Sequence, residues 1–86
     1  MILSKSCEYA IRATVYVASK TRRNEKVGII EVAGAIGSPT PFTGKKSQTL
    51  VRTKVLSSAK GQNGGFYLDN VDSLYLVDII RAVEGN

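Results

Sequence analysis

The stretch "AIGSPTPFT", residues 35–43, contains the signals for the end of one helix and the start of the next. Gly37 can adopt the left-handed backbone that closes a helix, and Pro39 prevents the same helix from resuming. Thr40 is a good N-cap residue, and Pro41 suits the first helical position, where its missing N–H loses nothing. The stretch therefore predicts two helices joined by a sharp turn.

Two segments before this turn have helical patterns. Residues 5–20 repeat apolar side chains at three-four spacing, with Ser4 placed to cap the start and Glu8 placed to form an ion pair with Arg12. The apolar positions are Tyr9, Ala10, Ala13, Tyr16 and Val17. Residues 27–36 are predicted to begin as a strand and to continue as a helix up to the turn.

Downstream of the turn, a third helix is predicted over about residues 41–53. Its core side is thin, because Lys46 falls between Phe42 and Leu50. Residues 55–60 and 66–68 are typical of a short hairpin. A last helix has apolar positions Leu76, Ile79, Ile80 and Val83, with Gly85 as its stop and Asp78 and Arg81 as a surface pair. We therefore expect one domain over residues 1–86, mainly α with a small β-hairpin, arranged as a winged helix-turn-helix.

The charge of the chain is unevenly distributed. The chain contains twelve Lys and Arg residues and seven Asp and Glu residues, which gives a net charge of +5. No acidic residue lies between Glu31 and Asp69, and the basic residues of that stretch are Lys45, Lys46, Arg52, Lys54 and Lys60. A polyanion such as double-stranded DNA is the partner that this pattern favours, although a solvated basic face that aids solubility is the simpler alternative.

Several classes of protein are disfavoured by what the composition lacks. The chain has no histidine and one cysteine, Cys7, so the common hydrolytic triads and multi-cysteine metal sites cannot be built within it. We expect Cys7 to be buried and inert, and the chain not to be an enzyme. The amino-terminal residues mix charges into their apolar positions, unlike a secretory signal, so we expect a cytoplasmic protein.

The third helix and the hairpin tip contain the candidate binding residues. Base edges are read from the first turns of a recognition helix, so the candidates there are Thr40, Thr43, Lys45 and Gln48, and Ser38 could hold a phosphate from the turn. At the hairpin tip, the glycines of "KGQNGGFYL" (60–68) would permit close approach to a phosphate backbone, and the tip residues Lys60, Gly61, Gln62 and Asn63 would supply the contacts. We expect the tip to lie next to the third helix. The alternative is a turn that needs glycine only for positive φ.

Four stretches resemble the Rrf-two family of bacterial winged-helix transcriptional regulators: "LSKSCEYAIRATVYVA" (3–18), "SPTPF" (38–42), "SSAKGQNGGFYL" (57–68) and "LVDIIRAVEG" (76–85). The resemblance implies a sequence-specific regulator, expected to be a repressor, that binds partly palindromic DNA as a homodimer. It implies that the third helix enters the major groove and the wing the minor groove. By matching position, Lys5, Tyr9, Ser38, Thr40, Lys60 and Gly61 would contact DNA.

This chain also departs from the family pattern. Lys46 and Ser47 stand where the recognition helix of the family usually has large apolar residues, and Gly44 stands where some members have an acid. Family members continue well beyond this length, into a dimerisation helix and, in the sensors, three cysteines that bind an iron-sulfur cluster. With Cys7 alone, no cofactor is expected in this chain. The alternative function is a winged-helix module that binds a protein partner without binding DNA.

Overall fold

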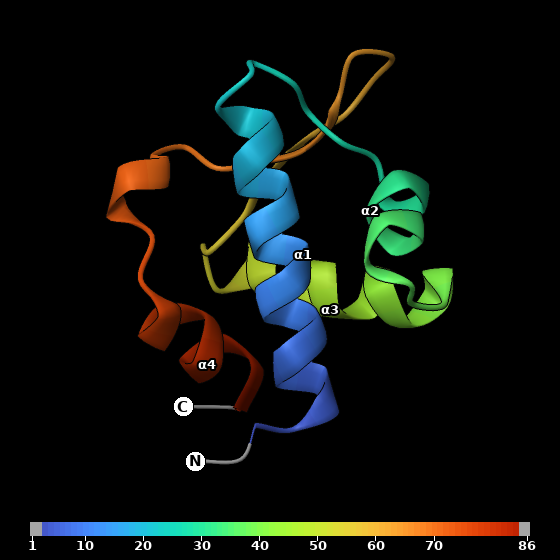
Figure 1. The fold of residues 1–86 in the computed structure, drawn as a ribbon. Helices are drawn as coiled ribbons and strands as arrows, with labels where there is room; N and C mark the ends of the chain where they lie inside the picture. Colours follow the sequence, from blue (N-terminus) through green and yellow to red (C-terminus); the bar gives the residue numbers. More distant parts are fainter. Residues whose placement is uncertain (1–2, 85–86) are drawn as a thin grey trace.

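The computed structural model describes residues 3–84, and its four α-helices and hairpin follow the predicted order, with one 3-10 helix that was not predicted from the sequence (Figure 1). They are α1 (Lys5–Thr21), α2 (Ile29–Ile36), α3 (Thr40–Arg52), β1 (Ser57–Ala59), β2 (Gly65–Tyr67), the 3-10 helix η1 (Val71–Ser73) and α4 (Leu76–Glu84). The winged helix-turn-helix fold is confirmed: α2, the turn and α3 are followed by the hairpin of β1 and β2.

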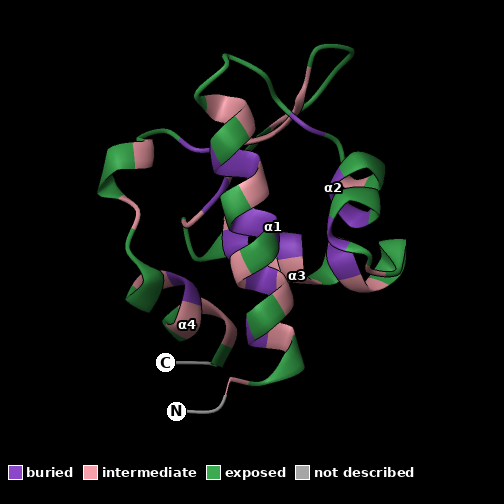
Figure 2. Cartoon of the chain, viewed as in Figure 1, coloured by how far each residue is buried: buried purple, intermediate pink, exposed green. Residues whose placement is uncertain are grey.

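Helix α1 runs through the centre of the molecule, and its buried stripe is the middle of the core (Figure 2). The stripe consists of Cys7, Ala10, Ala13, Thr14, Val17 and Ala18. Ser4 caps the helix as predicted, because its side chain accepts a hydrogen bond from the Cys7 N–H at 3.1 Å. The predicted pair of Glu8 and Arg12 is not among the ion pairs of residues 3–84, and the Arg12 guanidinium lies over the Tyr9 ring instead.

The strand predicted at Val27 and Ile29 is reduced to one isolated bridge at Val27, because Ile29 already belongs to the predicted helix. Val27 forms an isolated bridge with Phe66, in which the Val27 N–H donates to the Phe66 carbonyl at 3.1 Å and the Phe66 N–H donates back at 2.7 Å. The helix then begins at Ile29 and ends at Ile36, and its C-cap Gly37 has the predicted left-handed backbone with φ 67°. The bridge ties the hairpin to the start of the helix-turn-helix.

Helix α3 differs from its prediction in two ways. It begins at Thr40, and the N-cap is Pro39, not Thr40. Pro39 already has the extended backbone of a cap, and its carbonyl accepts the Thr43 N–H at 2.9 Å, so the first helical turn closes one residue earlier than predicted. The core side also differs: it consists of Thr43, Ser47 and Leu50, whereas Phe42 and Lys46 lie at its margin.

The hairpin and the last helix complete the core. In the hairpin, Ser58 pairs with Phe66, and the flanking Leu56 and Leu68 are 2% and 4% exposed. Ile79 of α4 is buried as predicted, but Leu76 is 55% exposed, because α4 packs against the core mainly through its middle and end.

The other predictions for the carboxyl-terminal segment have mixed outcomes. The predicted pair of Asp78 and Arg81 is not among the ion pairs of residues 3–84, and Gly85 lies outside the described residues. The only long-range ion pair of this segment within that range joins Asp72 to Arg22 at 3.3 Å. No helix within residues 3–84 is long and apolar enough to cross a membrane.

Candidate nucleic-acid interface

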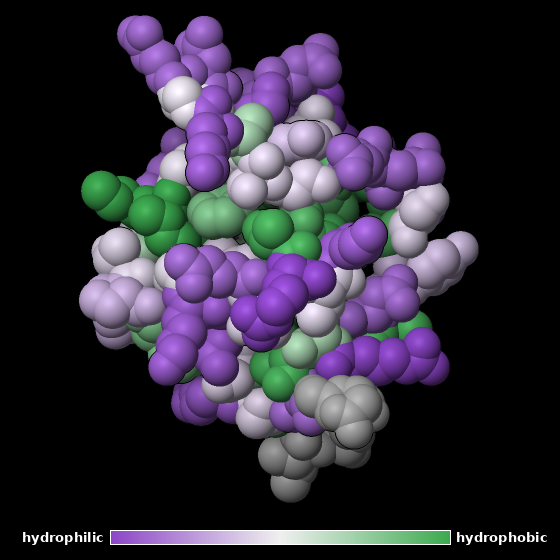
Figure 3. All heavy atoms as spheres, turned by 180° about the vertical axis from the view of Figure 1, so that it is seen from behind, coloured by the Kyte–Doolittle hydropathy of each residue, from purple (hydrophilic) through white to green (hydrophobic). Residues whose placement is uncertain are grey.

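The outer face of α3 is polar and contains no carboxylate. Thr40, Lys45, Gln48 and Arg52 are all exposed along it. In Figure 1, α3 lies behind α1, so Figure 3, seen from behind, shows the side of the molecule to which α3 belongs. Hydrophilic side chains cover most of this view, around a band of hydrophobic atoms. Three of the four predicted base-reading residues therefore lie on an accessible face.

The fourth predicted base-reading residue, Thr43, is not accessible. It is 2% exposed, and its hydroxyl donates to the Pro39 carbonyl at 2.9 Å. Thr43 therefore belongs to the core side of α3 and is removed from the candidate contacts. The spacing of apolar residues did not reveal this, because a buried threonine whose hydroxyl bonds to its own helix has the same sequence signature as an exposed one.

Ser38 is oriented differently from the prediction. Its hydroxyl oxygen is buried and has no hydrogen-bond partner among the described residues, and its N–H already donates to the Ala33 carbonyl at 3.0 Å. The Ser38 side chain thus points inward here and does not present its hydroxyl to a phosphate. The first turn of α3 remains a suitable place for an anion, because no side chain caps it and no acid lies within it.

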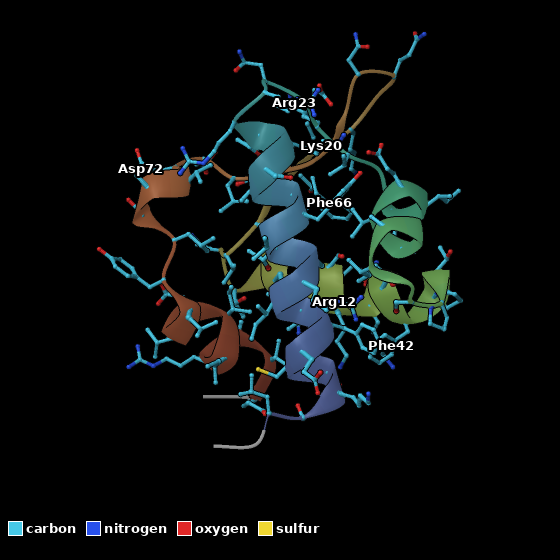
Figure 4. The ribbon with its side chains drawn as sticks, in the orientation of Figure 1. Arg12, Lys20, Arg23, Phe42, Phe66 and Asp72 are labelled. Carbon is cyan, nitrogen blue, oxygen red and sulfur yellow. The ribbon has the colours of Figure 1, made fainter. Side chains whose placement is uncertain are left out.

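A row of aromatic and cationic side chains connects α1 to α3. Tyr9 and Phe42 meet edge to face, with ring centroids 5.5 Å apart. Arg12 lies over the Tyr9 ring and Lys46 over the Phe42 ring, each 5.4 Å from the centroid. In Figure 4, Arg12 is labelled on α1 and Phe42 lies near it, beside the start of α3. Tyr9, a predicted DNA contact, therefore lies against α3. Arg12 and Lys46 lie beside this aromatic pair, which was not predicted from the sequence.

The wing tip is exposed, and the backbone around it explains why two of its residues are glycine. Lys60, Gly61, Gln62 and Asn63 are all exposed. Gly61 has φ +100°, and Gly65 has φ +135° with backbone atoms of Val27 only 2.8 Å from where a Cβ would stand. The turn and the bridge to Val27 are thus sufficient to require glycine at these two positions. Close approach to a phosphate is not needed to explain them.

The expectation that the wing tip lies next to α3 is wrong. In Figure 1 the tip projects beyond the upper end of α1, whereas α3 lies across the lower half of the molecule. Lys5, at the start of α1, is exposed at the lower end. A ligand that contacted all three regions would have to extend along the molecule, as a nucleic-acid duplex does.

Two side chains on α1 have shifted pKa values that bear on the site. Hydrogen bonding to Glu31 at 2.6 Å raises the pKa of the Tyr16 hydroxyl, and this bond, with Lys20 3.7 Å from the same carboxylate, holds α2 against α1. Burial raises the pKa of the Cys7 thiol, and the negative charges of Glu84 and Glu8 add to this effect. The thiolate that could bind iron is therefore disfavoured.

Residues 3–84 contain no group of three or more histidine, cysteine or acidic side chains that could hold a metal ion. Cys7 is 0% exposed, and it is the only cysteine of the chain. A protein-bound iron or iron-sulfur centre needs several sulfur, nitrogen or carboxylate ligands that converge on one point. The donors of the described residues do not fit such a centre.

Comparisons with known proteins place the chain in a family. The model of the Rrf2 family, described as iron-dependent transcriptional regulator, matches residues 3–86. A protein of Aquifex aeolicus (strain VF5), named as an HTH-type transcriptional regulator, is 36% identical over 82 residues, which are 94% of this chain and 56% of that protein. Protein aau3 of Rhizobium meliloti (strain 1021) is 31% identical over 85 residues, which are 98% of this chain and 54% of that protein. The chain thus spans about half the length of these curated relatives.

Two solved structures share the fold. CymR, the global cysteine regulator of B. subtilis, superposes with a TM-score of 0.88 and 20% identity, over 100% of this chain and 67% of that one. IscR of T. potens superposes with a TM-score of 0.89 and 23% identity, over 99% of this chain and 62% of that one. The matching family is one of transcriptional regulators and not of enzymes. The chain belongs to the Rrf2 family of transcriptional regulators and has its winged helix-turn-helix fold.

Proposed function

We propose that this chain binds double-stranded DNA sequence-specifically and acts in the cytoplasm as the DNA-binding domain of a repressor. The observation that carries the proposal is the exposed outer face of α3, which presents Thr40, Lys45 and Gln48 without any carboxylate. Gln48 can form two hydrogen bonds with adenine, and Lys45 can donate to guanine in the major groove.

The other candidate contacts would position the domain on the duplex. Lys60, Gly61, Gln62 and Asn63 at the wing tip suit the minor groove or its phosphates. Lys5 and Tyr9 at the start of α1, with Arg12 and Lys46 beside them, would contact the phosphate backbone. These residues come from separate parts of the molecule, which supports binding along a duplex and not at a single point.

We also propose that the protein acts as a homodimer through the start of α4. Tyr75, Leu76 and Val77 are 64%, 55% and 48% exposed, which is unusual for three consecutive large apolar residues. Two copies related by a two-fold axis would bury this segment and would match a palindromic site with two half-sites. The same exposed segment supports the alternative function, a module that binds another protein.

The DNA-binding proposal is tested by fluorescence anisotropy with a labelled duplex from the region upstream of the gene of this protein. Lys45→Glu and Lys60→Glu should each weaken binding by about tenfold or more, because each replaces a phosphate or base contact by a repulsion. Arg22→Glu is the matched control, since Arg22 lies beside Asp72, which Figure 4 shows on the opposite side of α1 from α2. The control should bind nearly as well as the unchanged chain.

Salt dependence gives an independent measurement in the same assay. The logarithm of the binding constant should fall steeply with the logarithm of salt concentration, by about 0.9 for each phosphate contacted. Lys60→Glu should reduce the magnitude of this slope by about 0.9, the value for one phosphate contact. A binding constant that hardly changes between low and moderate salt, or a Lys45→Glu variant that binds as well as Arg22→Glu, would rule out the proposed face.

A further inference from the structure

An open groove lies at the carboxyl-terminal end of α3, beginning one residue after the last proposed base contact, Gln48. Its volume is about 810 Å³, and its walls are the carboxyl-terminal end of α3, the base of the hairpin, the η1 segment and α4. This volume lies within the range of small-molecule sites in proteins, about 300 to 1,000 Å³. The wing tip and the amino-terminal half of α3 do not line the groove. Of the residues named on the outer face of α3, only Arg52 also lines the groove.

The lining of the groove is partly apolar. Val55, Leu68, Leu74 and Ala82 contribute to it, and all four belong to the core cluster or pack against it. A flat apolar group laid against these side chains would be removed from water on one face, which is favourable. The groove could thus bind a ligand with an apolar body and not only an ion.

Three cations and two carboxylates line the groove, an excess of one positive charge. Arg52 is the last residue of α3, Lys54 follows its C-cap, and Arg81 lies on α4; none of the three forms an ion pair within residues 3–84. The two carboxylates are Asp69 and Asp78, and Asp69 already accepts a hydrogen bond from the Ser57 hydroxyl at 3.0 Å. An excess of cations that includes two guanidinium groups favours a carboxylate or phosphate, which arginine binds through two parallel hydrogen bonds.

We propose that this groove binds a small molecule with a carboxylate or phosphate group on a flat apolar body. Arg52 and Arg81 would hold the anionic group from two different helices, and the body would lie on Leu68 and Leu74. Because the ligand would contact α3, the base of the wing and α4 together, its binding would change the affinity for DNA. This second statement rests on the DNA-binding function proposed above, whereas the binding site itself does not.

The coupling has a physical basis in the end of α3. The Leu50 carbonyl accepts hydrogen bonds from the N–H groups of Val55, at 2.8 Å, and Leu56, at 3.1 Å, so the end of α3 is bonded directly to the chain that enters β1. A ligand that pulls Arg52 toward Arg81 would act on this junction. The ligand can change the affinity for DNA only by the ratio of the ligand's own affinities for the free protein and for the DNA-bound protein.

The test of binding uses phenyl phosphate as the probe, in a titration of the ¹⁵N-labelled chain followed by NMR. Saturable shifts are expected at the amides of Val55, Leu68, Asn70 and Ser73, which line the groove or adjoin it. Inorganic phosphate and phenol, each carrying half of the proposed chemistry, should both bind more weakly. Arg81→Gln and Arg52→Gln should each weaken phenyl phosphate binding by about tenfold.

The matched control is Arg23→Gln, an exposed arginine outside the groove, and it should leave the affinity for phenyl phosphate unchanged. Arg81 is exposed, so its variant should keep the folded spectrum. No saturable shift, or shifts confined to the region of Lys45 and Lys60, would overturn the proposed site, the latter by assigning the phosphate to the DNA face.

The coupling is measured separately, as DNA affinity with and without saturating phenyl phosphate. A change of at least about threefold that is absent in Arg81→Gln is expected. An unchanged DNA affinity with the groove occupied would overturn the coupling but not the site. If the chain binds no DNA at all while phenyl phosphate still shifts the groove amides, the proposed function fails and the binding site stands.

Discussion

At the level of single residues, the small side chains of Thr43 and Ser47 determine how α3 packs against the core. Thr43 and Ser47 are 2% and 1% exposed, and with Leu50 they form the side of α3 that meets the core. Side chains of this size let the helix backbones approach closely, and the Thr43 hydroxyl is buried at little cost because it donates to Pro39. The larger Phe42 is thereby displaced to the margin, where it meets Tyr9.

A change of Gly65 to alanine tests whether the bridge to Val27 depends on glycine. The new Cβ would stand 2.8 Å from the Val27 backbone, at a φ of +135° that other residues rarely adopt. We expect Gly65→Ala to lower the free energy of unfolding by about 2 kcal/mol or more, measured by urea denaturation.

Gly34 provides the matched control for that change. It lies inside α2, and a Cβ there would meet nothing within 4 Å. Gly34→Ala should therefore raise the free energy of unfolding by about 1 kcal/mol, because alanine is the better helix former. Equal effects of the two changes would show that the close approach to Val27 is unimportant.

At the level of an element, the residues at the two ends of α3 determine where this helix begins and ends. At its start, Pro39 supplies the cap and no side chain assists. At its end, the C-cap Thr53 is followed by Lys54, which has a left-handed backbone with φ 68°. This position normally favours glycine, and a lysine there is strained.

Lys54→Gly should relieve this strain. We expect the free energy of unfolding to rise by about 1 kcal/mol, as measured by urea denaturation. Lys54→Ala is the control, since it removes the same charge but keeps the Cβ, and it should change the stability by less than about 0.5 kcal/mol. If both variants are stabilised equally, the charge of Lys54 and not its backbone is responsible.

The distribution of charged and apolar surface matters at the level of the whole molecule. The basic stretch between Glu31 and Asp69 supplies both α3 and the wing, while the exposed apolar residues Tyr75, Leu76 and Val77 lie at the start of α4. The proposed DNA contacts and the proposed dimer contacts are therefore on different elements. Changes in one set should leave the other intact.

Sedimentation experiments over a range of protein concentrations test the dimer. The unchanged chain should show reversible association, and Leu76→Ser combined with Val77→Ser should shift it toward the monomer, because the apolar area to be buried is lost. Ile30→Ser is the control, since Ile30 is 77% exposed on α2, and it should associate as the unchanged chain does. A chain that remains monomeric throughout would contradict the proposed α4 interface.

The order and type of the four α-helices and the hairpin could be predicted because they depend on residues close together in the chain. Ser4 caps α1, Gly37 ends α2, and the glycines around residues 61–65 turn the hairpin, all through hydrogen bonds or backbone angles within a few positions. The exposed candidates Thr40, Lys45 and Gln48 on α3, and those at the wing tip, also follow from local spacing.

The tertiary structure alone decided which side of α3 is buried, where Ser38 points, how far the wing tip lies from α3, and that Arg12 and Lys46 flank one aromatic pair. Each of these depends on contacts between segments far apart in the chain. Such contacts are chosen by packing, which buries the small Thr43 and Ser47 and leaves the larger Phe42 and Lys46 partly exposed at the margin. Helical periodicity places side chains around an axis, but only the neighbouring helices determine which side faces inward.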